Sequence, residues 1–298
     1  MENRGYVIAT DSTADMPVEY YKENNVRFIG MQYTIDGKEY VQHSANELEI
    51  KEFYDMVRNG SMPKTSQVSY ENLSKLFEEI VKEGKDILYI CFSSALSGSY
   101  QTSLLAANDI TEKYPEAKIK VIDSISACSG EGYLVHHCVK KRNEGASLDE
   151  LAQYAEKIKH RVIHLFTVND LNHLHRGGRL SKLSAVVGGM LGIKPVLYFD
   201  DTGHLLPYTK IRGRRQSLEA MAKQMKEKYV PGENEEIFIS DADAREEAEY
   251  LGEYIKKLMP DVKTIRYGKI GAVIGTHAGP ETVALFFIGK DREPVDIK

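Results

Sequence analysis

The chain has 298 residues, enough for two domains of ordinary size, and its 42% hydrophobic and 28% charged residues fit a folded globular protein. A formal net charge of −5 argues against a general nucleic-acid binder, because such proteins need a basic stripe to neutralise phosphates. Three cysteines without CxxC spacing give no disulfide framework, and the sequence has no signal peptide and no run of about 20 apolar residues. We therefore expect a soluble, cytoplasmic protein.

Short β-rich runs alternate with helical patterns through the first half of the chain. The sequence predicts four strands there, at residues 6–10, 27–35, 86–92 and 118–123. Apolar residues that recur every three or four positions predict a helix over 69–84, with Gly84 as its C-cap. Strands joined by crossover helices predict an α/β domain with a mostly parallel sheet flanked by helices.

The predicted strands and helices of the second half follow a different order. Helices are predicted over 216–229 and 243–259, the latter with Asp243 as N-cap. Strands are predicted at 163–168, 194–199, 204–210, 236–240, 262–267, 271–275 and 283–288. The turn at 200–203 predicts a hairpin, so we expect a second α/β domain with a mixed sheet. A boundary near His160 divides the chain into residues 1–160 and 161–298.

Clusters of small hydroxyl residues follow three of the first-half strands, at 11–15, 93–100 and 124–127. Ligands of an open parallel sheet bind outside the carboxyl ends of its strands, and a helix N-terminus there favours an anion. Ser97 with Gly98 is the most specific pair, since the hydroxyl can donate to an oxyanion and glycine permits close approach. Capping is the more frequent role of such residues, and it also explains the segment around Thr65.

His277 stands in a Gly-Thr-His-Ala-Gly-Pro segment directly after the predicted strand 271–275. The small residues leave room around the imidazole, which can donate a hydrogen bond to a carboxylate or assist phosphoryl chemistry. A loop histidine without a role is the simpler alternative. His160 and His164 have helical spacing for a metal, but no further ligand completes a set, so we expect no metal site.

Arg179 and Arg212 lie beside glycines, a pattern typical of carboxylate or phosphate recognition. A solvated charge cluster is the more ordinary explanation for Arg214 and Arg215. The sequence contains no GxxxxGK[ST] loop, dinucleotide fingerprint or GxSxG elbow. We therefore expect no ATP site of its own and no cofactor.

Eight stretches, taken together, resemble the DegV family, bacterial fatty-acid-binding proteins that act as acyl-carrying subunits of fatty acid kinase. They follow the family's order nearly end to end. The stretches are VIATDSTADMP (7–17), KTSQVS (64–69), SSALSGSYQTS (93–103), VIDSISA (121–127), LNHLHRGGRLS (171–181), LGIKPVLYFDDTG (191–203), KIRGRRQS (210–217) and IGAVIGTHAGPE (270–281).

The resemblance implies a long-chain fatty acid buried between two α/β domains. Its carboxylate would be presented to an ATP-dependent kinase subunit, which phosphorylates it to an acyl phosphate. The resemblance thus implies a chain that is not itself an enzyme, and it is compatible with transient membrane contact. It assigns the carboxylate to Thr65, Ser97, Gly98 and His277, and the head-group and kinase-facing surface to Arg179 and Arg212.

Two other functions stay open at this point. A stand-alone hydrolase would use Ser97 as nucleophile and His277 as base, and it would need a carboxylate to orient the histidine. A small-molecule sensor or structural module would leave the head-group residues dispensable.

Overall fold

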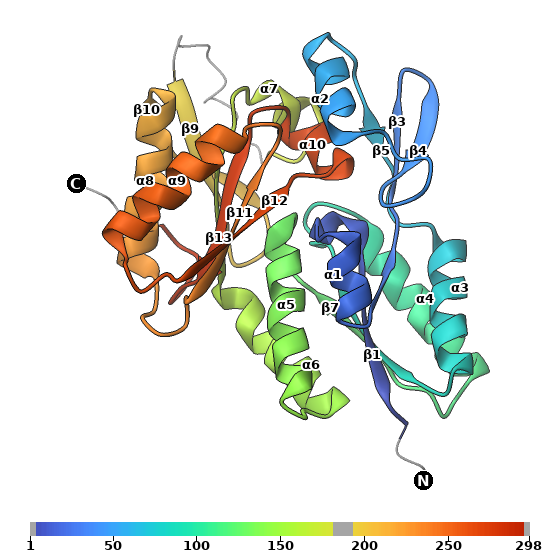
Figure 1. Ribbon diagram of the computed structural model, residues 1–298. Coiled ribbons are helices and arrows are strands. Elements are labelled where there is room, and N and C mark those ends of the chain that lie inside the picture. Colours follow the sequence, from blue (N-terminus) through green and yellow to red (C-terminus); the bar gives the residue numbers. More distant parts are fainter. Residues whose placement is uncertain (1–3, 181–192, 295–298) are drawn as a thin grey trace.

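The computed structural model describes residues 4–180 and 193–294, so Ser181, Leu191 and Gly192 of the motif stretches lie outside the described residues. The described chain forms a four-stranded sheet, a six-stranded sheet and a small three-stranded sheet, all accompanied by helices (Figure 1). In this part of the chain, no helix is both long and apolar enough to cross a membrane.

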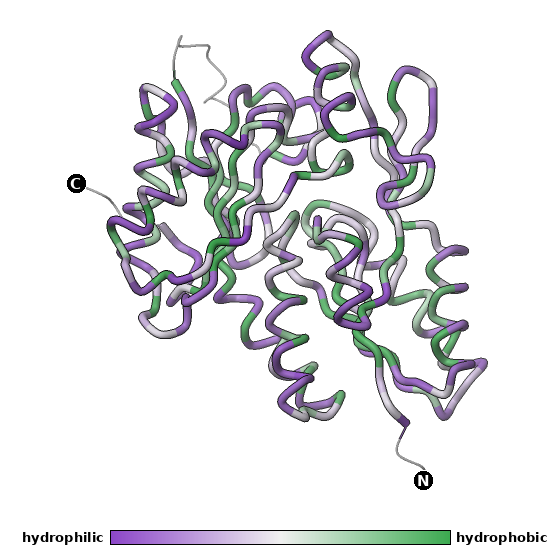
Figure 2. Tube along the Cα trace, viewed as in Figure 1, coloured by the Kyte–Doolittle hydropathy of each residue, from purple (hydrophilic) through white to green (hydrophobic). Residues whose placement is uncertain are grey.

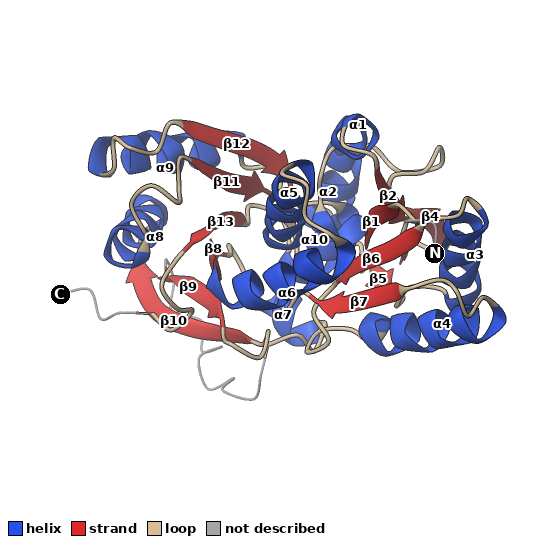
Figure 3. Ribbon diagram, turned by 90° about the horizontal axis from the view of Figure 1, so that it is seen from below, coloured by secondary structure: helices blue, strands red, loops and turns tan. Residues whose placement is uncertain are grey.

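The four-stranded sheet is entirely parallel, with strand order β2-β1-β6-β7. Its strands are β1 (Tyr6–Asp11), β2 (Val26–Ile29), β6 (Asp86–Cys91) and β7 (Ile119–Asp123). The helices that pack against this sheet include α1 (Val18–Glu23), α3 (Tyr70–Lys82), α4 (Ser99–Lys113), α5 (Ser129–Asn143) and α6 (Leu148–Ile158). Helices cover both faces of the sheet, which confirms the predicted class (Figure 3).

Alternate strand residues face opposite helix layers. Val7 and Ala9 of β1 share an apolar cluster with Phe77 of α3, whereas Ile8 belongs to the cluster that contains Leu134 of α5. A strand buried on both faces reads as a continuous apolar run, because neither face has to meet water. Figure 2 shows this hydrophobic character along the central strands.

The single strand predicted at 27–35 is wrong. The chain leaves the parallel sheet after β2, and β3 (Gln32–Ile35) instead pairs antiparallel with β4 (Lys38–Val41) and β5 (Lys64–Thr65). The switch occurs at Gly30, where a Cβ would lie 2.6 Å from the carbonyl oxygen of Gln42. This small sheet, which lies beside α2 (Ile50–Arg58) in Figure 1, carries Thr65.

The six-stranded sheet is mixed, as predicted, with strand order β10-β9-β8-β13-β11-β12 and one parallel pair, β11 with β12. Its strands are β8 (Val162–Thr167), β9 (Ile193–Phe199), β10 (Leu205–Arg212), β11 (Glu236–Asp241), β12 (Thr264–Lys269) and β13 (Val283–Ile288). β9 and β10 form the predicted hairpin. Helices α8 (Arg214–Lys228) and α9 (Arg245–Leu258) pack on its outer face.

The inner face of this sheet turns toward the first half of the molecule. Ile163 and Leu165 of β8 belong to the outer cluster with α8 and α9, whereas Phe166 belongs to the inner cluster together with Ile8 and Leu134. The described strands of the parallel sheet all precede residue 160, and those of the mixed sheet all follow it. The division into 1–160 and 161–298 remains a prediction, because the inner apolar cluster is continuous across both halves.

The strand predicted at 271–275 is also wrong, because this segment forms the helix α10 (Ala272–Ala278). The N–H of Gly275 donates to Gly271 at 2.7 Å and that of Gly279 to Gly275 at 2.8 Å, which is the helical pattern. A short apolar run does not distinguish a strand from a buried helix by period alone. His277 therefore lies in the last turn of a helix rather than in a loop after a strand.

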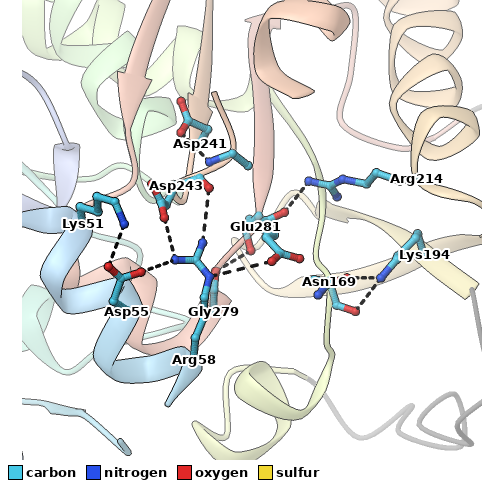
Figure 4. A network of polar contacts seen from close by, with 12 residues as sticks. Lys51, Asp55, Arg58, Asn169, Lys194, Arg214, Asp241, Asp243, Gly279 and Glu281 are labelled. Atoms are coloured by element: carbon cyan, nitrogen blue, oxygen red, sulfur yellow. Dashed lines mark hydrogen bonds and ion pairs between the residues drawn. The ribbon is translucent and has the colours of Figure 1, made fainter. Parts of the chain in front are cut away.

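Asp243 is not the N-cap of α9. The N-cap residue is Ala244, and no side chain caps α9; Asp241 accepts the N–H of Ala244 at 3.0 Å. Asp243, at φ 57°, accepts a 2.6 Å hydrogen bond from Arg58 of α2. Figure 4 shows Arg58 joining Asp243 and the nearby Glu281 to the first half of the chain.

Candidate functional site

A pocket lies between the carboxyl ends of β6 and β7 and the inner face of the mixed sheet. It holds about 800 Å³ of atom-free space, its open mouth included. Most of its wall is apolar. The lining side chains include Met31, Phe92, Leu96, Phe166, Leu174, Phe199, Leu205, Ile270, Val273, Ile274, Ala284 and Phe286. Such a wall suits a long apolar group.

Polar side chains gather in one part of the wall and come from segments far apart in the sequence. Thr65 of β5 and His277 of α10 are 212 positions apart, yet Thr65 Oγ1 lies 2.8 Å from His277 Nε2. Ser97 and Arg179 line the same pocket. The N–H of Val68 donates to Ser99 Oγ at 3.0 Å, which ties the Thr65 segment to the start of α4.

Ser97 and Gly98 form the turn before α4. The Ser97 hydroxyl lies 2.8 Å from Ser99 Oγ and accepts the Ser99 N–H at 3.2 Å, so part of its role is local. Gly98 is the N-cap residue, and α4 receives no side-chain cap. A Cβ at Gly98 would overlap the carboxamide oxygen of Gln67, so glycine permits this close approach. Ser97 also lines the pocket, whereas Ser69 is an ordinary N-cap of α3, accepting from Asn72.

His277 is neutral at physiological pH. Burial, together with the positive charge of Arg179, lowers its pKa from 6.5 to about 4. Its Nδ1 is buried and has no hydrogen-bond partner among the described residues. Arg179 donates to the carbonyl oxygens of Leu96 and Gly177, and no carboxylate within residues 4–180 and 193–294 forms an ion pair with it. The polar part of the pocket therefore combines two hydroxyls, an imidazole and a guanidinium, a set that suits an anion.

Comparison with known proteins identifies the family. The model of the DegV family, described as uncharacterised protein, DegV family, matches residues 6–290. A DegV domain-containing protein of Clostridium perfringens is 43% identical over 289 residues, covering 97% of this chain and 99% of that protein. The chain belongs to the DegV family.

Solved DegV-like structures share the fold. A fatty acid binding DegV family protein from Streptococcus agalactiae is 29% identical, with a TM-score of 0.85 over 97% of this chain and 100% of that one. A stearic-acid-binding protein from Eubacterium ventriosum is 26% identical, with a TM-score of 0.84 over 96% of this chain and 98% of that one. This chain thus shares its overall fold with both of these structures.

Three arginines at the end of β10 and the start of α8, Arg212, Arg214 and Arg215, do not line the pocket. Arg212 is exposed at the end of β10 and is not among the residues that line the pocket. The sequence favoured a solvated charge cluster for Arg214 and Arg215. This is wrong for Arg214, because its side chain is half-buried and donates to the carbonyl oxygen of Glu281. Arg215 lies over the ring of Tyr250, 5.1 Å from its centroid. Arg179 is therefore the only one of these four arginines that lines the pocket.

The geometry does not form a hydrolase triad in this DegV-family chain. The hydrogen bonds of the Ser97 hydroxyl go to Ser99, and His277 Nε2 faces Thr65. Within residues 4–180 and 193–294, no carboxylate accepts from His277 Nδ1 to orient the ring. In the same ranges, no group of three or more His, Cys, Asp or Glu side chains is arranged to hold a metal ion.

The aromatic wall of the pocket was missed by sequence reasoning. His164 and Phe166 of β8 reach it from the inner face of the mixed sheet, as do Phe199 of β9 and Phe286 of β13. The alternation along each strand is visible in the sequence. The sequence does not show which of the two faces meets the cavity, because both faces of β8 and β13 are buried and mostly apolar.

Proposed function

We propose that this DegV-family chain binds a long-chain fatty acid and presents its carboxylate to an ATP-dependent kinase subunit, which forms the acyl phosphate. The observation that carries the proposal is the apolar pocket with Thr65, Ser97 and His277 in one part of its wall. The names of the relatives from S. agalactiae and E. ventriosum support the ligand class. The division of the chain at residue 160 would place the lipid between two domains.

The proposed carboxylate site works by hydroxyl donation. If His277 donates its Nε2–H to Thr65 Oγ1, the Thr65 hydroxyl hydrogen is free to point at the ligand. Ser97 supplies a second hydroxyl, and Gly98 lets the ligand approach the backbone. A hydrogen bond to a charged group contributes about 1.5–3 kcal/mol, which offsets part of the cost of burying the carboxylate.

The apolar wall supplies the rest of the affinity. Each buried CH₂ group contributes about 0.8 kcal/mol to binding. Burial of a long acyl chain therefore contributes on the order of 10 kcal/mol, before the entropic cost of ordering that chain is subtracted. The apolar side chains that line most of the pocket suit such a chain.

Arg179 and Arg212 would take part in presenting the carboxylate to the kinase. Arg179 lines the pocket beside His277, and its positive charge suits a carboxylate that becomes an acyl phosphate. Arg212 is exposed at the end of β10, where it is available to a partner protein. The chain itself would perform no chemistry and need no cofactor, and the partner's use of ATP places the complex in the cytoplasm, with transient membrane contact during lipid exchange.

The experiment is mass spectrometry of organic extracts from purified protein, followed by reconstitution with a bacterial fatty acid kinase subunit, ATP and the loaded chain. We expect one fatty acid per chain and an acyl phosphate that hydroxylamine traps. Arg212→Ala should reduce acyl phosphate formation at least tenfold while fatty acid binding stays within twofold of wild type. Clean extracts together with an esterase activity that disappears in Ser97→Ala would overturn the proposal in favour of a hydrolase.

A further inference from the structure

The helix that carries His277 is short and receives no cap from its own N-terminal residue. α10 has seven residues, and its N-cap residue, Gly271, has no side chain that could accept a hydrogen bond from the first turn. So short a helix is marginal by itself, and its position depends on contacts with α2, α7, β3 and β5 (Figure 1). The residues of α10 that line the pocket are Val273, Ile274, His277 and Ala278.

Gln42, which is 1% exposed, supplies the missing cap from 231 positions away. Its Oε1 accepts the N–H of Val273, in the first turn of α10, at 3.1 Å. Its Nε2 donates to the carbonyl oxygen of Ser12 at 2.8 Å and to Asp15 Oδ1 at 2.9 Å. Because Nε2 meets two acceptors and Oε1 meets a donor, the orientation of the amide is determined. A side-chain oxygen that accepts an N–H of the first turn is what an N-cap residue normally provides.

The backbone of Gln42 extends these hydrogen bonds to the pocket wall. Its N–H donates to the carbonyl oxygen of Met31 at 3.0 Å, and the N–H of Met31 donates to Ser12 Oγ at 2.9 Å. Met31 lines the pocket. Gln42 therefore joins the turn after β1, the wall at Met31 and the start of α10 in one buried set of hydrogen bonds.

Tyr54 of α2 anchors the same end of α10. Its buried hydroxyl donates to the carbonyl oxygen of Ile270 at 2.7 Å. A Cβ at Gly275 would overlap this hydroxyl, so glycine lets the helix pack directly on the Tyr54 ring. With the start of α10 held in this way, the last turn brings His277 Nε2 to 2.8 Å from Thr65 Oγ1.

We propose that Gln42 is a positioning residue of the carboxylate site, which fixes the first turn of α10 and thereby holds His277 against Thr65. The inference rests on the proposed fatty acid binding and deepens it. Gln42 is not among the residues that line the pocket, so its effect on the ligand passes through α10. His277 lies about one helical turn after Val273, and a displaced first turn moves the imidazole away from the Thr65 hydroxyl that it orients.

The test compares octadecanoic acid with octadecan-1-ol, which has the same chain and no carboxylate, in equilibrium binding of the radiolabelled compounds to the delipidated full-length chain. Gln42→Met keeps the length of the side chain and removes its three hydrogen bonds. We expect the variant to bind octadecanoic acid about tenfold more weakly, which corresponds to one hydrogen bond to a charged group. Octadecan-1-ol should bind as it does to wild type.

The matched control is Asn234→Leu. Asn234 is also a buried amide with three hydrogen bonds, but its partners are Val230 and Ile288 rather than α10. This variant should bind both ligands as wild type does. A second readout reports on the head group: the ¹³C resonance of bound [1-¹³C]octadecanoic acid should shift in Gln42→Met and stay unchanged in Asn234→Leu.

Tyr54→Phe tests the same anchoring if Gln42→Met does not fold, because it removes a single hydroxyl at the start of α10. We expect it to weaken octadecanoic acid and not octadecan-1-ol. The inference is overturned if the folded variant binds octadecanoic acid as wild type does, or if both ligands lose affinity alike, as a merely structural role predicts. If wild-type protein binds neither ligand, the proposed function fails and the inference with it, and that outcome is distinguishable from the other two.

Discussion

Thr65→Val removes one hydroxyl from the proposed carboxylate site and little else. Valine keeps the shape and β-branching of threonine, so the pairing of β5 with β3 is retained. The substitution removes the group that lies 2.8 Å from His277 Nε2 and, in our proposal, donates to the ligand. Any loss of affinity can then be assigned to the hydroxyl.

The expected magnitude follows from the charge of the ligand. A hydrogen bond to a charged group contributes about 1.5–3 kcal/mol, and each 1.4 kcal/mol is tenfold in affinity, so we expect the dissociation constant to rise roughly 10- to 100-fold. The assay is calorimetric titration of delipidated protein with octadecanoic acid. Thr34→Val is the matched control, because Thr34 is also half-buried in the small sheet but does not line the pocket.

The control should bind within twofold of wild type. Adding Ser97→Ala to Thr65→Val should weaken binding further, since Ser97 supplies the second hydroxyl. Unchanged affinity in the double variant would refute the carboxylate site while leaving the apolar pocket intact.

Three further predictions concern stability. Because the pKa of His277 is about 4 when folded and near 6.5 when unfolded, the unfolded state takes up the proton first, and stability should fall by at most about 3 kcal/mol from pH 6.5 to 4. His277→Gln should lessen this loss in urea titrations, and parallel curves would contradict the assignment. Arg292→Met should cost about 3 kcal/mol in the same assay, because the buried guanidinium donates to three backbone carbonyls, and a cost under about 1 kcal/mol would contradict this. Arg58→Met breaks the contact with Asp243 between the two halves and should lower the melting temperature by about 2 °C. The control Lys51→Met should leave the melting temperature unchanged. Equal shifts in the two variants would contradict a specific role for the Arg58–Asp243 ion pair.

Much of the fold followed from local patterns. The helix over 69–84 and the hairpin at 200–203 are confirmed, because helical period and turn residues act over a few positions. The errors at 27–35 and 271–275 share a physical cause. Each is a short apolar run whose partners lie elsewhere in the chain, so tertiary contacts rather than local propensity chose its conformation.

The sequence by itself determined the fold class, the family and the chemical types of the candidate head-group residues, because periodicity and motifs are properties of neighbouring positions. Only the tertiary structure decided that Thr65 meets His277 and that Arg212 does not line the pocket. It also showed that His164 lines the pocket from the inner face of the mixed sheet. Contacts across 212 positions depend on how sheets stack and which face turns inward, and a strand with two apolar faces carries no local mark of that choice.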